Sequence, residues 1–218
     1  MIVARILCLL IGYGFGLLQT AYLYGKYKGF DIRTKGSGNA GTTNMLRTLG
    51  KKAGALTLAG DMLKCVIAVF ITWLLFRNRY PDYTALLKIW TAFGVIIGHD
   101  FPFYMNFKGG KGVAACAGLF VAFGDWRLFL LGFVSFFGLL FITHYVSLSA
   151  LLVHLELLAY MIVVGSITGF GMPRAAVIEL IVITALIAAL TFWKHRGNIQ
   201  RLLHGSERKT YLTKKSEQ

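Results

Sequence analysis

The sequence predicts an all-α membrane protein that crosses the bilayer about seven times. Its 218 residues are 56% hydrophobic with a mean hydropathy of +0.64, which is more apolar than an ordinary soluble domain. Several apolar runs have the roughly 17–25 residues that a membrane-spanning helix needs. Between these runs the polar residues gather in a few basic segments. We therefore expect one integral-membrane domain, residues 1–218, with helices as its only spanning elements.

Five apolar runs are long enough to span the bilayer. They are residues 2–24, 53–76, 127–143, 145–166 and 175–193. Two further runs, 84–97 and 113–123, are short. Each short run is either a tilted span or one half of a re-entrant hairpin, and hydropathy does not separate these cases.

The placement of positive charge predicts the orientation of the chain. Lys and Arg number 23 against 9 Asp and Glu, for a net charge of +14. Segments 26–52, 108–111 and 194–215 hold seven, two and seven of these cations. Because cytoplasmic loops carry the excess of Lys and Arg, we expect the N-terminus outside and the C-terminus in the cytoplasm, with no nucleic-acid partner. The thinner outer set is Arg77, Arg79, Arg127 and Arg174.

The cysteines do not indicate a disulfide framework or a metal site. Cys8, Cys65 and Cys116 all lie in or beside apolar runs, where cysteine behaves as a small buried hydrophobe. No CxxC pair is present. We expect neither a metal nor a cofactor.

The first polar motif is "TKGSGNAGTTNMLR", residues 34–47, which contains the pattern G-x-G-x-x-G. A dinucleotide site needs this pattern between a strand and a helix, with an acid about 20 residues further on. Here apolar runs flank it, and Asp61 lies inside the second run. Glycine still lets backbone amides approach an anion, and Arg47 offers a fork suited to phosphate. The alternative is a solvated basic turn near anionic headgroups.

The second motif is "GHDFPFYMNFKGGKGVA", residues 98–114. Its Gly109, Gly110, Lys111 and Gly112 resemble half of a P-loop, but Gly112 stands where the Mg²⁺-binding Ser or Thr belongs. ATP hydrolysis is therefore not expected. Backbone amides that open a helix at Val113, together with the Lys charge, can still cradle a phosphate.

The third motif is "KHRGNIQRLLHGSERK", residues 194–209. His195, Asn198 and Arg201 recur at i, i+3 and i+6, so they share one face if the last helix continues past the membrane. The alternative is a polybasic segment attracted to acidic lipids. Three such motifs on one membrane face favour a common phosphate site over three unrelated loops.

These three blocks together resemble the bacterial acyl-phosphate:glycerol-3-phosphate acyltransferases, the integral-membrane PlsY family. The first resembles S-G-N-x-G-x-T-N-x-x-R, from Ser37 to Arg47. The second resembles G-H…F-x-G-G-K-G, from Gly98 to Gly112, and the third resembles H-x-x-N-I-x-R-L…E, from His195 to Glu207. A family-like "YVSLS" follows at 145–149. The resemblance covers most of the chain.

The resemblance implies transfer of a fatty acyl group from acyl phosphate to the 1-hydroxyl of sn-glycerol 3-phosphate. The products are 1-acylglycerol 3-phosphate and inorganic phosphate, in the first acylation step of phospholipid synthesis. The site would lie on the cytoplasmic face of the bacterial plasma (inner) membrane. The expected partners are the two substrates, the bilayer and a peripheral enzyme that makes acyl phosphate.

The resemblance and the motif geometry also assign residues to the two substrates. For glycerol 3-phosphate they are Ser37, Arg47, Lys111, His195 and Asn198. For acyl phosphate they are Thr43, Gly109, Gly110, Lys111, Gly112 and Ser147. Supporting roles fall to Asn39, Asn44, His99, Arg201 and Glu207, and the catalytic set is His195, Lys111 and Asn198.

A covalent acyl-enzyme is disfavoured, because no histidine is followed by Asp in the pattern H-x-x-x-x-D and no G-x-S-x-G elbow occurs. Acyl phosphate is already activated, so positioning and charge stabilisation can supply much of the rate. Two bases remain open: the substrate's own phosphate, or His195.

Two other functions compete with an acyltransferase. A transporter of an organic phosphate also fits polytopic helices with buried cations, although the motifs gather on one side and no inverted repeat is evident. A lipid-binding scaffold would use only the basic loops. Inside the second apolar run, Asp61 and Lys64 stand at i and i+3, and we expect them to form a buried structural pair.

Overall fold

The structure, a computed structural model, is described for residues 1–211, and the regular secondary structure in that range is helical. Lys214 and Lys215 of the predicted basic tail lie outside the described residues. The helices are α1 (Ile2–Gly16), α2 (Thr20–Tyr27), α3 (Thr42–Leu49), α4 (Lys51–Phe76), α5 (Thr84–Asp100), α6 (Val113–Ala122), α7 (Trp126–Thr143), α8 (Val146–Thr168), α9 (Arg174–Lys194) and α10 (Arg196–Leu203).

Five segments are long and apolar enough to cross a membrane, which confirms the predicted all-α membrane class. They are Ile2–Tyr27, Lys51–Phe76, Trp126–Thr143, Val146–Gly171 and Arg174–Lys194. The two short runs of the sequence are α5, with 17 residues, and α6, with 10 residues. Many large apolar side chains of the helices are exposed, among them Phe70, Leu75 and Ile162. They are suited to contact with lipid.

The first apolar run is broken, where the sequence predicts one continuous helix over 2–24. The break falls at residues 17–19, between α1 and α2. Gln19 is fully buried there, and its side-chain Nε2 donates to the Gly16 carbonyl at 3.1 Å and to the His99 carbonyl at 2.9 Å. A buried amide inside an apolar run therefore satisfies backbone carbonyls of two helices.

Helices α1 and α5 pack backbone against backbone. Gly12 and Gly16 of α1 face Gly94 and Gly98 of α5, and a Cβ built on any of the four would collide with main-chain atoms of the partner helix. Small residues allow membrane helices to approach this closely. The contact positions the last turn of α5, which carries His99 and leads into the second motif.

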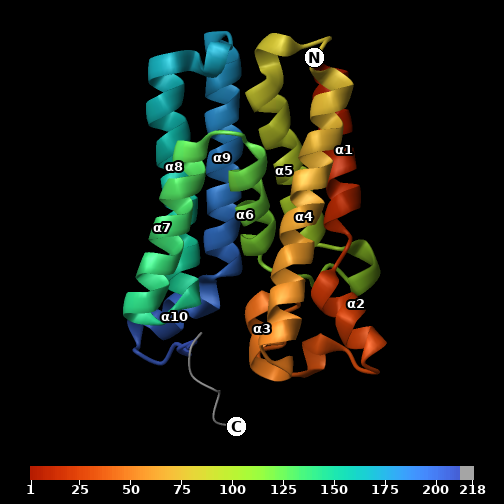
Figure 1. Cartoon of the computed structure of the whole chain (residues 1–218), viewed down its shortest axis with the longest axis vertical. Helices are drawn as coiled ribbons and strands as arrows, with labels where there is room; N and C mark the ends of the chain where they lie inside the picture. The colour runs from red at the N-terminus through yellow and green to blue at the C-terminus, as the bar shows by residue number, and fades with distance from the viewer. Residues whose placement is uncertain (212–218) are drawn as a thin grey trace.

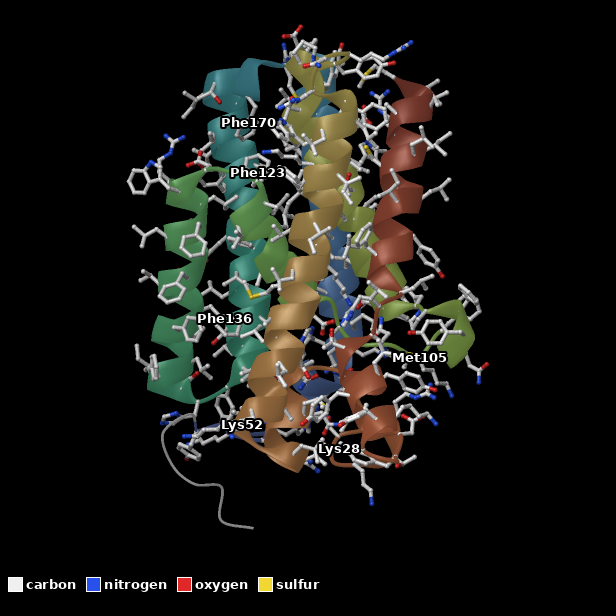
Figure 2. The ribbon with its side chains drawn as sticks, turned by 45° about the vertical axis from the view of Figure 1, so that its right-hand side comes forward. Lys28, Lys52, Met105, Phe123, Phe136 and Phe170 are labelled. Carbon is white, nitrogen blue, oxygen red and sulfur yellow. The ribbon has the colours of Figure 1, made fainter. Side chains whose placement is uncertain are left out.

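All three basic segments lie toward one end of the bundle, as the charge pattern predicts. Figure 1 shows α2, α3 and α10 at the lower end, with the N-terminus and the α8–α9 turn at the upper end. In Figure 2, Lys28, Lys52 and Met105 lie toward the lower end, and Phe123 and Phe170 lie toward the upper end. The polar motifs are therefore neighbours in space.

The glycine contact predicts unequal effects of two neighbouring substitutions in α1. In Gly12→Ala the new methyl group meets the Thr91 carbonyl, whereas at Gly14 nothing lies within 4 Å. Overpacking of this kind costs about 1–3 kcal/mol. We expect Gly12→Ala to lower the thermal unfolding midpoint in detergent by several degrees and Gly14→Ala to leave it unchanged or slightly raised. Equal midpoints for the two variants would contradict this account of the contact.

Candidate active site

A cavity of about 1060 Å³ is lined by residues from all three motifs. One part is polar and is lined by the loops around α3, α6 and α10. The other part is apolar and runs between α4, α6, α7 and α8, past Met62, Ala117, Phe133 and Val153. The single cavity thus joins a cationic region to an apolar groove.

Most of the residues predicted for the site line this cavity. They are Ser37, Asn39, Thr43, Asn44, Arg47, His99, Lys111, Ser147, His195, Asn198, Arg201 and Glu207. Gly109, Gly110 and Gly112 flank Lys111 without lining the cavity themselves. The structure therefore brings together side chains that are up to 170 residues apart in the sequence, from Ser37 to Glu207.

Asn44 organises the first motif from its centre. Its Oδ1 accepts a hydrogen bond from the Ser37 amide at 2.8 Å, and its Nδ2 donates to the carbonyls of Lys35 and Asn39, each at 3.0 Å. Gly36 has φ +59°, and a Cβ there would collide with the Asn44 side chain. The glycines therefore let the loop close around a buried asparagine, and this closure leaves Ser37 exposed at the cavity.

The second motif uses its glycine amides differently from the prediction. The Gly109 amide donates to the Asp100 carbonyl at 3.2 Å, and the Gly110 amide donates to the His99 carbonyl at 3.0 Å. These two amides tie the turn to the end of α5 and are not free to bind an anion. Within residues 1–211 the amides of Lys111 and Gly112 have no such partner. Any phosphate cradle therefore begins at Lys111.

The third motif bends instead of continuing the last spanning helix. His195 ends α9 and begins α10, so the two helices are separate elements. The bend still brings Asn198 to Lys111, whose Nζ donates to the Asn198 Oδ1. Lys111 and Asn198 thus form a direct contact between the second and third motifs.

Glu207 holds several of the polar groups in place. Its Oε1 accepts from Asn198 Nδ2 at 2.7 Å and from Ser147 Oγ at 3.0 Å, and its Oε2 accepts from Arg201 Nε at 2.7 Å. Burial raises the pKa of Glu207, but these three hydrogen bonds outweigh it, so the pKa lies below its ordinary value. The carboxylate stays ionised among the cations.

Burial and neighbouring charge lower the pKa values of two central groups. The pKa of Lys111 falls to about 8, chiefly because of burial and then because of Arg201. The pKa of His195 falls to about 4, again chiefly through burial and then through Lys111. His195 Nδ1 lies 2.8 Å from the Thr191 carbonyl, which can only accept. The neutral ring therefore carries its proton on Nδ1 and keeps a lone pair on Nε2.

The segment after α10 reaches across the site, and sequence reasoning missed it. Arg47 Nη2 donates to the Arg208 carbonyl at 2.9 Å and to Thr210 Oγ1 at 2.6 Å. The Thr210 amide donates to the His144 carbonyl at 2.8 Å. Thr210 follows the third motif, and no sequence pattern marks it.

Lys194 is a second cavity residue that sequence reasoning missed. Its position next to His195 in the sequence was the signal that could have identified it.

Fold and cavity together define a polytopic membrane protein with a cationic site at one end of its bundle and an apolar groove leading from it. The chain belongs to the glycerol-3-phosphate acyltransferase family, whose model matches residues 6–205.

Relatives and solved structures agree over nearly the whole chain. A glycerol-3-phosphate acyltransferase of Clostridioides difficile is 38% identical over 215 residues, covering 95% of this chain and 96% of the relative. One from Halalkalibacterium halodurans is 40% identical over 203 residues, covering 92% and 93%. The crystal structure of PlsY (YgiH), an integral membrane glycerol 3-phosphate acyltransferase, in its glycerol 3-phosphate form has a TM-score of 0.80 at 30% identity, covering 95% of this chain and 96% of that one.

The Asn44 contacts predict that Asn44→Ala loosens the first motif. The change leaves the Ser37 amide and two carbonyls without their partner, at about 1–3 kcal/mol for each group that stays buried. We expect trypsin to cut after the exposed Lys35 several-fold faster than in the unmodified protein. Asn78→Ala, at an exposed position at the other end of the bundle, is the matched control. Equal cleavage rates in all three proteins would contradict the role given to Asn44.

Proposed function

We propose that this glycerol-3-phosphate acyltransferase uses acyl phosphate as its donor and transfers the acyl group directly to the 1-hydroxyl of sn-glycerol 3-phosphate. The family supplies the acceptor, the integral-membrane setting and the place in phospholipid synthesis. The observation that carries the proposal on the donor is the cavity, which joins a cationic pocket to an apolar groove. A donor with a phosphate at one end and an alkyl chain at the other fits both parts.

The polar pocket has the residues to hold two phosphates. We assign Ser37, Arg47, Lys111, His195 and Asn198 to glycerol 3-phosphate, because all five line one pocket and carry donors or cations. In this assignment Arg47 exchanges its contacts with residues 208–210 for the substrate phosphate.

The acyl-phosphate end takes the remaining donors. They are the hydroxyls of Thr43 and Ser147 and the backbone from Lys111 to Gly112, where α6 begins. Gly109 and Gly110 serve this end by shaping the turn, since their amides bind α5. Lys111 lies between the two phosphates in this arrangement and balances charge on both.

The chemistry needs no acyl-enzyme. The 1-hydroxyl oxygen attacks the donor's carbonyl carbon, a new ester C–O bond forms, and the anhydride C–O bond breaks to release inorganic phosphate. The hydroxyl proton passes to a phosphate oxygen of the substrate. His195 is a weak base because its pKa is about 4. It is better suited to orienting the acceptor, since its Nε2 lone pair can accept a hydrogen bond from the 2-hydroxyl of glycerol 3-phosphate and leave the 1-hydroxyl proton directed at the phosphate.

The proposed setting is the bacterial plasma membrane, with the site on the cytoplasmic face. In this proposal α1 and α2 count as one segment, and the short helices α5 and α6 join the five long segments to make the seven crossings expected from the sequence, with the N-terminus outside. A peripheral enzyme that makes acyl phosphate could then deliver it at the basic end of the single domain. A transporter would place its site at the midplane between repeats, whereas the polar region here lies at one end.

The donor is tested by supplying purified protein with palmitoyl phosphate and glycerol 3-phosphate. We expect lysophosphatidic acid and inorganic phosphate in equal amounts, and no product from a palmitoyl thioester. Lys111→Ala should lower turnover roughly a hundredfold, because charge stabilisation of the leaving phosphate is lost. Lys108→Ala is the control, since Lys108 is exposed in the same loop and does not line the cavity. Product formed from the palmitoyl thioester and none from palmitoyl phosphate would rule out the proposed donor. Enzyme-dependent phosphate release in the absence of glycerol 3-phosphate would rule out direct transfer.

The pKa of Lys111 predicts the alkaline limb of the pH profile. Lys111 binds phosphate only when it is protonated, so kcat/KM for glycerol 3-phosphate should fall as the pH rises above about 8. The substrate phosphate does not titrate there, because its second pKa is about 6. In Lys111→Arg the guanidinium keeps its charge, and the limb should move above pH 10, given an Arg pKa of about 12 or higher. A limb that stays near pH 8 in this variant would assign it to another group.

A further inference from the structure

The end of α5 places His99 between a buried ion pair and the glycine turn. Lys64 of α4 makes three short contacts: to the Leu18 carbonyl at 2.7 Å, to His99 Nδ1 at 2.8 Å and to Asp61 Oδ1 at 2.9 Å. Lys64, Asp61 and His99 are almost completely buried. The Gly16 carbonyl, at 3.4 Å, is a fourth and weaker acceptor. The three short contacts match the three N–H donors of an ammonium group, so we assign Lys64 as charged and donating to all three.

This arrangement fixes the tautomer of His99. An ammonium group has no acceptor, so Nδ1 must present its lone pair to Lys64, and the ring proton must sit on Nε2. Asp61 Oδ1 is 3.8 Å from Nδ1, too far to accept a proton from it. A second proton on the ring would point directly at the Lys64 charge. His99 is therefore held neutral with Nε2–H as its one donor.

The Nε2 edge of His99 lies against the phosphate-binding turn. A Cβ built on Gly110 would collide with His99 Nε2, and the Gly110 amide donates to the His99 carbonyl at 3.0 Å. His99 also lines the cavity. Within residues 1–211 Nε2 has no hydrogen-bond partner. The ring thus carries one unused donor at the edge of the pocket.

We propose that His99 Nε2–H donates a hydrogen bond to the donor's phosphoryl group beside the Lys111–Gly112 backbone, and that Lys64 and Asp61 are positioning residues that keep this proton on Nε2. The inference rests on the proposed function, because it assumes a phosphoryl group at the turn. The sequence predicts that Asp61 and Lys64 form a buried structural pair. In this proposal the pair also determines which ring nitrogen of His99 carries the proton.

The other charged groups around His99 do not set its tautomer. Asp100 follows it on α5, Lys194 of α9 donates to the Asp100 carbonyl at 3.1 Å, and Lys111 lies at the far side of the turn. None of these three makes a hydrogen bond to the His99 ring within the described residues. They are unchanged in the variants below, so their effects cancel in a comparison.

The test measures binding of a long-chain acyl phosphonate, an unreactive analogue in which carbon is bonded directly to phosphorus. Its dissociation constant is determined by calorimetry at pH 8 for the unmodified protein and for Asp61→Asn/Lys64→Met, and nitrogen NMR of the His99 ring reports which ring nitrogen carries the proton in each protein. The double change removes both charges together and leaves side chains of similar size. Arg5→Met/Glu179→Gln removes the ion pair between α1 and α9 and serves as the matched control.

We expect the double variant to bind the phosphonate roughly tenfold more weakly than the unmodified protein at pH 8. Without Lys64 the ring adopts both tautomers, and one of them turns a lone pair toward the phosphoryl oxygen. Nitrogen NMR shifts of the His99 ring should show the proton on Nε2 in the unmodified protein and a mixture of both tautomers in the double variant. The control variant should match the unmodified protein in both binding and ring shifts.

Unchanged His99 ring shifts in the double variant, or a ring proton on Nδ1 in the unmodified protein, would overturn the inference, because a purely structural role would weaken binding without changing the tautomer. His99→Ala is the second variant: it should bind roughly tenfold more weakly at pH 8, and unaltered binding would also overturn the inference. Failure of the proposed donor gives a different result, namely an unmodified protein that does not bind the phosphonate and acylates glycerol 3-phosphate only from a thioester.

Discussion

The backbone contact between α1 and α5 is the constraint on which the site depends. Because Gly16 and Gly98 leave no room for side chains between them, the end of α1 lies directly on the last turn of α5. The backbone carbonyls left without helix partners between α1 and α2 accept hydrogen bonds from two buried side chains, Gln19 and Lys64. Both groups also bond to His99, Gln19 through the carbonyl and Lys64 through the ring. His99 in turn holds the Gly110 amide. A chain of contacts thus connects the close helix packing to the turn that the proposed function assigns to phosphate.

A small number of hydrogen-bond acceptors compensates the positive charge of the cations in the site. Glu207 receives hydrogen bonds from Asn198, Arg201 and Ser147, and Arg47 is met by the Arg208 carbonyl and by Thr210. An uncompensated cluster of cations at a membrane boundary would repel itself and bear a large desolvation cost. The chain after α10 supplies much of the compensation. In the proposed function a substrate phosphate takes over this role when it enters.

Much of the fold and the identity of the site could be predicted from the sequence. Apolar runs predicted the spanning segments, and the charge pattern predicted that the three motifs meet at one end, because both follow from the cost of burying polar groups in lipid. The break at residues 17–19 was not predictable from hydropathy, since Gln19 is satisfied only by carbonyls from α5, which is distant in sequence. The use of the Gly109 and Gly110 amides depends on the same tertiary contact. Thr210 carries no motif, and its role arises only from the path of the chain.

The shape of the cavity also supports the proposal that the site works without a nucleophilic side chain. The apolar groove runs beside α7, where Gly132 lets the Phe120 ring of α6 pack against the helix backbone, and in the proposed function it takes the alkyl chain. The polar end, where Lys111 contacts Asn198, takes the phosphate in that proposal. An amphiphilic donor bound in this way has its reactive carbonyl at the boundary between the two regions, next to the groups that orient the acceptor. Since the donor is already activated, fixing this geometry and stabilising the leaving phosphate removes most of what a covalent intermediate would achieve.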